Sequence, residues 1–209
     1  MAITLAEEVV LLALDDESGA VRQRQTVAYA VAAGILLELV LAGRASVAGK
    51  HVELTDPAPT GDRLLDGRIA LLEAWLGGRR RRRVADWLTK DQNKALGAAL
   101  ESLCARGVVV EERRKALGVF PVRRYPEADG AVEAELRERL RAVVREGAAP
   151  DVRTAGLVAL LHGAKAHRLA FPDAPRRQVT ERVEEVAAGH WAAESLRTAI
   201  RNMQAAATV

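Results

Sequence analysis

The sequence predicts a mainly α, single-domain helical bundle with surrounding amphipathic helices and short β-hairpins. Apolar residues recur at helical spacing in several segments that begin at a capping residue or end at a glycine. Two valine-containing stretches between these segments have the pattern of β-hairpins. The chain has 209 residues, of which 49% are hydrophobic, so one large core can form and we expect one domain over residues 1–209.

The first part of the chain predicts two helices and a hairpin. Thr4 and Glu7 form a capping-box pattern, so the first helix is expected to begin there, with one apolar face directed inward. Residues 26–41 predict a second helix that is apolar over a wide arc, and we expect it to be central. Gly43 is placed to end this helix, and residues 44–54 predict a small hairpin.

The rest of the chain predicts further helices and a second hairpin. A helix over residues 64–76 precedes the arginine run and a short helical stretch around Trp87. A separate amphipathic helix over residues 94–106 then leads to a hairpin between Val108 and Val122, and no other strands are expected. After a linker, the chain is expected to be helical over residues 131–146, 153–168, 176–188 and 190–204.

No catalytic or metal-binding pattern is found in the sequence. His162 and His167 are five positions apart, whereas a pair four apart would share a helix face for a metal ion. Cys104, the single cysteine, is on the apolar side of its helix and is expected to be a buried structural thiol. Asp62 is expected to cap a turn rather than to act with Asp66. We therefore expect no enzymatic activity, no metal and no cofactor.

The strongest electrostatic feature is the run Arg79, Arg80, Arg81, Arg82 and Arg83. The net charge of +3 permits an anionic partner without requiring one. One interpretation of the run is a solvated linker before a helix. Another is contact with anionic lipid, where each basic group contributes about 1 kcal/mol near the surface. Nucleic-acid backbones would attract the same charges, and the sequence does not separate these interpretations.

The tip of the second hairpin combines basic and apolar residues. Arg113, Arg114 and Lys115 are followed closely by Leu117 and Phe120. The two apolar side chains either fold back onto the core or contact a membrane interface or another subunit. Both interpretations remain open from the sequence.

Three strings in the chain resemble the Golgi phosphoprotein 3 family. They are Thr-Leu-Ala-Glu-Glu at residues 4–8, the apolar stretch at residues 34–44, and Pro-Thr-Gly-Asp-x-Leu-Leu-Asp at residues 59–66. The Arg-Thr pair that opens residues 153–162 is similar to the start of a late helix in that family. The resemblance covers nearly the whole chain, and the arginine-rich, alanine-rich composition is typical of a bacterial, actinobacterial member. It implies a mostly helical domain with a protruding hairpin that serves membrane or oligomer contacts.

The lipid site of the family does not carry over. Eukaryotic members read phosphatidylinositol 4-phosphate, and the positions that align with their pocket are Gln23, Ala32, Asn93 and Leu96, none of which matches. We expect weak or no selectivity for that lipid. The basic residues that flank these positions, together with the arginine run, are the candidate lipid contacts: Arg22, Arg24, Lys90, Lys94, and Arg79 to Arg83.

The leading hypothesis is a non-enzymatic, cytoplasmic protein, peripheral at the inner face of the membrane. It would bind an anionic phospholipid surface or a protein partner, as a homo-oligomer formed through the second hairpin. Met1 to Leu14 carries two glutamates and no basic start, so we expect no signal peptide. The alternative is a winged-helix-like regulator that binds nucleic acid, because Leu-x-x-Leu-x-x-x-Gly followed by a hairpin occurs at residues 36–43 and again at residues 100–107.

Overall fold

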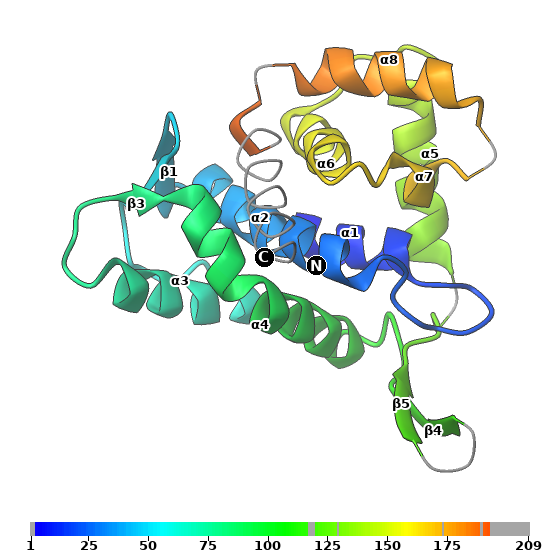
Figure 1. The fold of residues 1–209 in the computed structure, drawn as a ribbon, viewed down its shortest axis with the longest axis horizontal. Coiled ribbons are helices and arrows are strands. Elements are labelled where there is room, and N and C mark those ends of the chain that lie inside the picture. Colours follow the sequence, from blue (N-terminus) through cyan, green and yellow to red (C-terminus); the bar gives the residue numbers. More distant parts are fainter. Residues whose placement is uncertain (1–2, 117–119, 129, 173, 189, 193–209) are drawn as a thin grey trace, which may run out of the picture.

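The computed structural model describes residues 3–116, 120–128, 130–172, 174–188 and 190–192, with the side chains of residues 113–122 and 176 outside the description. The described helices form two layers around a central pair, α1 and α2 (Figure 1). Helices α3 and α4 pack on one side of the pair, and α5 to α8 lie on the other. The helices are α1 (Leu5–Ala13), α2 (Arg24–Leu41), α3 (Arg63–Leu76), α4 (Val84–Ala105), α5 (Ala131–Val144), α6 (Val152–Gly163), α7 (His167–Ala170) and α8 (Arg176–Ala187). The mainly α fold is therefore confirmed.

Helix α1 is buried on every side, whereas the sequence predicted that only one apolar face would be buried. The capping box at its start is confirmed, because the Thr4 backbone N–H donates to Glu7 Oε2 at 2.6 Å and the Glu7 N–H donates to Thr4 Oγ1 at 3.3 Å. All nine residues of the helix are buried, including Glu7 and Glu8. Two carboxylates inside the protein require partners from other elements.

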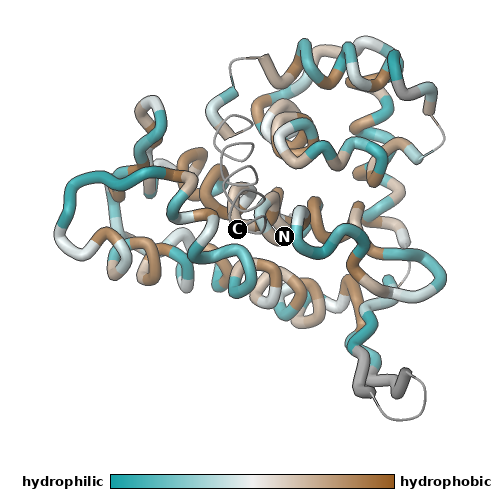
Figure 2. The backbone as a smooth tube through the Cα atoms, in the orientation of Figure 1, coloured by the Kyte–Doolittle hydropathy of each residue, from teal (hydrophilic) through white to brown (hydrophobic). Residues whose placement is uncertain are grey.

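Helix α2 is the apolar axis of the bundle, as Figure 2 shows by its colour. Its 18 residues are long and apolar enough to cross a membrane by length and composition. However, 72% of this stretch is buried in the structure, as in a core helix. A Cβ atom at Gly34 would lie 3.1 Å from the Ala6 backbone nitrogen, so the missing side chain lets α1 and α2 approach closely.

The first hairpin has a third strand that the sequence did not predict. Strands β1 (Ala45–Ala48) and β2 (His51–Leu54) are antiparallel and turn at Gly49, as expected. Strand β3 (Arg82–Arg83) adds to β2, with Val52 opposite Arg82. The expectation that strands occur only in the two hairpins is therefore wrong, because two residues of the arginine run complete this sheet.

The second hairpin projects from the body of the molecule (Figure 1). Its strands are β4 (Glu112–Ala116) and β5 (Phe120–Arg124), so the pairing begins later than the expected Val108. Val109 instead forms an isolated bridge with Glu127 at the root of the hairpin. The valines of this segment therefore fix the root of the hairpin, and its strands carry charged residues.

Two expected helix boundaries are wrong. The stretch around Trp87 and the helix over residues 94–106 form one continuous helix, α4, because no glycine or proline separates them. The expected helix over residues 153–168 is broken between α6 and α7, where Lys165 has a φ of +53°. Of the helix expected over residues 190–204, only residues 190–192 lie within the described chain.

Candidate functional site

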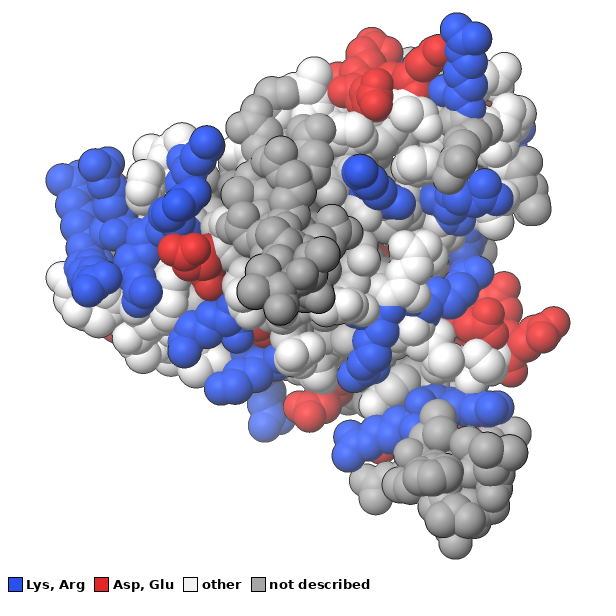
Figure 3. All heavy atoms as spheres, viewed as in Figure 1, with Lys and Arg blue, Asp and Glu red and all other residues white. Residues whose placement is uncertain are grey.

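The most basic part of the surface is formed by residues 44–56 and 77–83, which we call the basic arm. It contains seven Lys and Arg residues against two acidic residues. Figure 3 shows Lys and Arg gathered at the left edge, over the sheet and the loop between α3 and β3. The two acidic residues, Glu53 and Asp56, are each paired with an arginine of the arm, Arg80 and Arg44. The arm therefore carries a net positive charge that its own carboxylates only partly offset.

Arg82 is the member of the arginine run whose side chain packs against helix α3. Its Cζ lies 4.2 Å from the centroid of the Trp75 ring, and its guanidinium donates to the Trp75 carbonyl oxygen at 2.6 Å. Trp75 in turn packs against Trp87, with the ring centroids 5.3 Å apart. Arg82 is half-buried, and it fixes the arginine run to the layer formed by α3 and α4.

The other arginines of the run face solvent. Arg79, Arg81 and Arg83 are exposed and have no ion-pair partner within the described residues. The side chain of Arg80 is 87% exposed, and its contact with Glu53 is 3.4 Å long, so this pair contributes little. The run is therefore neither a uniform linker nor a uniform binding surface, because it consists of one fixed arginine and four exposed ones.

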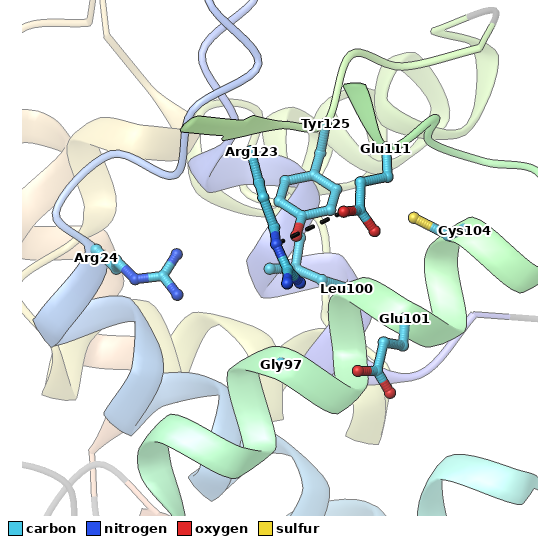
Figure 4. Close-up of a pocket in the computed structure, with 8 residues that line it drawn as sticks. All are labelled: Arg24, Gly97, Leu100, Glu101, Cys104, Glu111, Arg123 and Tyr125. Carbon is cyan, nitrogen blue, oxygen red and sulfur yellow. Dashed lines mark ion pairs between the residues drawn. The ribbon is translucent and has the colours of Figure 1, made fainter. Parts of the chain in front are cut away.

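A hollow of about 550 Å³ lies between the start of α2, the C-terminal half of α4 and the root of the second hairpin. Figure 4 shows Arg24, Glu101, Glu111 and Arg123 around it, with Arg123 directed toward Glu111. These two residues form an ion pair at 3.6 Å. The remaining lining residues are Gly97, Leu100, Cys104 and Tyr125. The hollow thus presents both signs of charge.

The start of α2 gives this hollow a positive end. Gln23, the N-cap residue, is left-handed with a φ of +48° and makes no side-chain capping bond. The first turn of α2 contains no acidic residue, and Arg24 is exposed. An uncapped helix N-terminus beside an arginine favours an anion. Glu101 and Glu111 on the other side of the hollow oppose a multiply charged anion.

The structure separates the predicted lipid-binding residues into two groups. Arg22 is half-buried and donates to the Leu14 carbonyl oxygen at 3.1 Å, so it holds the loop between α1 and α2. Lys90 and Lys94 are exposed on α4, one turn apart on the face that continues through Gly97 to the hollow. Of these predicted residues, Arg24 lines the hollow, Lys90 and Lys94 are exposed on α4 outside its lining, and Arg22 has a structural contact.

The four positions aligned with the family's lipid pocket also differ in placement. Ala32 and Leu96 are buried in the core at 0% and 1% exposure, so no ligand can touch them. Gln23 and Asn93 are exposed at the start of α2 and on α4. The candidate contacts of the second hairpin are Arg113, Arg114, Lys115, Leu117 and Phe120, whose side chains lie outside the described residues.

Several residues that line the hollow were not predicted from the sequence as candidate functional residues. Glu101, Glu111, Arg123 and Tyr125 meet around the hollow, but they come from a helix and from both sides of a hairpin, and no local spacing connects them. Cys104 lines the same hollow and is half-buried against the core, so it is less buried than expected. Burial and the negative charge of Glu111 raise the pKa of this thiol, which disfavours the reactive thiolate.

The geometry therefore defines a class of protein: a mainly α bundle with an exposed basic arm, a charged hollow and a projecting hairpin. Residues 5–203 match the model of the Golgi phosphoprotein 3 (GPP34) family, and the chain belongs to this family. A comparison with curated proteins finds no matching relative. The family resemblance of the sequence is thus confirmed over nearly the whole chain.

Proposed function

We propose that this protein is a non-enzymatic peripheral protein that binds anionic membrane surfaces through its basic arm. The observation that carries the proposal is the group of exposed arginines, Arg79, Arg81 and Arg83, held beside the body of the protein by the fixed Arg82. Membership in a family of non-catalytic adaptors supports the absence of enzymatic activity. Each basic group near an anionic membrane contributes about 1 kcal/mol, so three exposed arginines together contribute about 3 kcal/mol to attachment.

Selectivity for phosphatidylinositol 4-phosphate is not part of the proposal. A phosphate monoester is best bound by arginine forks or several backbone donors. The hollow offers Arg24 and the start of α2, but Glu101 and Glu111 lie on its other walls. We therefore expect binding to follow the surface charge of the membrane rather than the identity of the headgroup. Comparable binding to phosphatidylglycerol vesicles and to vesicles of equal charge with phosphatidylinositol 4-phosphate would support this.

The test uses a variant that removes exposed charge and leaves Arg82 in place. Replacing Arg79, Arg81 and Arg83 with serine should weaken sedimentation with phosphatidylglycerol vesicles by about 10- to 100-fold at low salt. It should also flatten the salt dependence, because charge attraction is screened within about 8–10 Å at ordinary salt. The matched control replaces three exposed arginines outside the basic arm, at positions 145, 168 and 177, and should bind like the parent.

Equal loss in both variants would show that net charge matters and the basic arm does not. Unchanged binding of the basic-arm variant would contradict the proposal.

The second hairpin is tested separately, by replacing Leu117 and Phe120 with serine. We expect weaker vesicle binding with little change in salt dependence, or a change in mass by light scattering if this hairpin joins subunits.

The nucleic-acid alternative is tested in the same experiment with a DNA duplex in place of the vesicles. A winged-helix reader needs an exposed helix before its hairpin to enter the major groove. Helix α2, which precedes the first hairpin, is buried over most of its length and cannot do so. Tighter binding to duplex than to vesicles at equal salt would favour the alternative despite this geometry.

A further inference from the structure

The root of the second hairpin carries a cluster of carboxyl groups that the membrane proposal does not use. A cavity of about 400 Å³ lies where the exit of the hairpin meets the loop between α1 and α2 and the start of α5. Its charged lining comes from all three elements: Asp15 and Asp16 from the loop, Glu127 from the hairpin exit, and Glu133 and Arg137 from α5. Tyr125 completes the titratable groups of the lining.

Glu127 and Glu133 both line this cavity, together with two further carboxyl groups, those of Asp15 and Asp16. Carboxyl groups gathered in one cavity repel each other when all are ionised, and a hydrogen bond between two of them needs a proton on one, because ionised carboxylates only accept. Glu133 is 8% exposed, and Glu127 Oε1 is buried with no hydrogen-bond partner in the described chain. Arg137 pairs with Glu133, which leaves Glu127 as the group that carries the proton.

The two carboxyl groups are held by elements of unequal rigidity. Arg137 donates to the carbonyl oxygens of Leu169 and Ala170, each at 3.1 Å, and so ties α5 to α7. The hairpin exit is held by the buried Tyr125 side chain and by backbone bonds, such as those from the Tyr125 N–H to the Gly19 oxygen at 2.7 Å and from the Ala128 N–H to the Val108 oxygen at 2.9 Å. Repulsion between the carboxylates would therefore displace the hairpin exit rather than α5.

We propose that Glu127 and Glu133 form a proton-dependent latch at the root of the β4–β5 hairpin. The latch is closed when the two carboxyl groups share one proton, and it is loosened when both are ionised. Because the hairpin projects from the body, its root sets how freely the hairpin moves (Figure 1). The latch does not depend on membrane binding, so either proposal can fail without the other.

The electrostatics place the transition near neutral pH. Burial, followed by the charge and hydrogen bond of Glu133 and the charge of Asp16, raises the pKa of Glu127 from 4.5 to about 7, and Arg137 opposes this shift. The folded protein therefore keeps a proton that the unfolded chain releases above pH 4.5. By linkage, stability contributed by this group is lost as the pH rises from 4.5 to about 7 and changes little above that value.

The direct test is a carbon-13 NMR titration of the glutamate carboxyl groups in the full chain, with amide exchange measured in parallel. We expect one glutamate signal, absent in Glu127→Gln, to titrate near pH 7. After correction for intrinsic rates, protection of the Val110 and Ala128 amides should fall as the pH rises from 4.5 to about 7, by at most about tenfold per pH unit, and should level off above that range. In Glu127→Gln, which keeps a neutral hydrogen-bonding group, the protection should not change with pH.

Two further variants keep the test decisive. Asp16→Asn removes a neighbouring negative charge and should move the titration of Glu127 to lower pH. Glu135→Gln, at an exposed position on α5, should leave both the titration and the exchange unchanged. The latch is overturned if Glu127 titrates near pH 4.5, or if protection at the hairpin root has the same pH dependence in the parent and in Glu127→Gln.

Discussion

Buried carboxylates at the centre of the protein are each matched by an arginine from a distant part of the chain. Glu7 pairs with Arg106 at 2.9 Å, and Glu8 pairs with Arg139 at 2.8 Å. Glu135 and Arg139 are four positions apart on α5, the spacing of a helix ion pair, but Arg139 pairs with Glu8 of α1 instead. Burial raises the pKa of Glu8 despite this partner. These pairs could not be predicted, because sequence spacing shows which residues share a helix face and not which helices meet.

Local signals at the residue scale were more informative. Asp62 caps α3 as expected, accepting from the Leu64 and Leu65 N–H groups at 2.9 and 3.2 Å. Glu133 and Arg137, which have the i,i+4 spacing of a helix ion pair, do form one. Both interactions lie within one helical turn, where backbone geometry alone decides which groups can meet.

Arg106 is expected to be critical for stability. It pairs with Glu7, which is 0% exposed, and also with Asp62. Arg106→Met would leave a buried carboxylate without its cation, so the free energy of unfolding in urea should fall by about 3–5 kcal/mol. Arg145→Met, at an exposed position, should change it by less than about 0.5 kcal/mol. Similar small effects for both variants would show that the Glu7 pair is not needed for the fold.

The arginine run should divide into structural and surface members. Arg82→Ser removes the contact with the Trp75 ring and a charged hydrogen bond, and should cost about 1–3 kcal/mol of stability. Arg81→Ser removes an exposed side chain and should cost less than about 0.5 kcal/mol. Thermal unfolding of the two variants measures the difference. Equal melting temperatures would mean that the Trp75 contact does not fix the basic arm.

At the scale of elements, the sequence predicted which helices exist better than it predicted where they begin and end. The helical period and the glycine ends correctly located α1, α2, α3, α5 and α8. The sequence did not predict β3, because this strand exists only through its pairing with β2. The break between α6 and α7 occurs at Lys165, a residue with no breaker signal of its own. The hollow beside α2 was equally hidden, since it requires three elements to be placed in space.

The close approach of α1 and α2 gives a prediction with an internal control. A methyl group at Gly34 would lie 3.1 and 3.2 Å from the backbone N and Cα atoms of Ala6, which cannot rotate away. Gly34→Ala should therefore destabilise the protein by about 1–3 kcal/mol through overpacking. A methyl group at Gly67, in the middle of α3, would meet nothing within 4 Å. Gly67→Ala should stabilise the protein by about 0.5–1 kcal/mol, through helix propensity alone.

Urea unfolding of the two glycine variants distinguishes packing from propensity. If propensity dominated at both sites, both alanines would stabilise the protein. Stabilisation by Gly34→Ala would show that α1 and α2 are further apart than described.

At the scale of the whole molecule, the core and the charged surface have separate roles. One cluster of buried apolar residues takes members from all eight described helices, including Leu36 of α2, Leu88 of α4 and Leu160 of α6. The basic arm and the second hairpin project from opposite ends of this body (Figure 1). Changes to the exposed side chains of the arm can therefore alter binding without disturbing the core.

The shared core leads us to expect that residues 1–209 unfold as one domain. Buried ion pairs also join the layers, since Arg153 of α6 pairs with Glu38 of α2 at 2.9 Å. In Trp191→Phe, the remaining tryptophans, Trp75 and Trp87, report only on the layer of α3 and α4. Far-UV circular dichroism reports on all helices, so a cooperative domain should give coincident urea transitions by the two probes.

The competing outcome is that α5 to α8 unfold before the rest. Circular dichroism would then lose amplitude at urea concentrations where tryptophan fluorescence is still native. Weakening the link between layers with Arg153→Met should not separate the two transitions if the apolar core provides the cooperativity. It should lower both midpoints together, because the same buried cluster connects α2 to α6 and α8. Separate midpoints in either protein would divide the chain into two folding units.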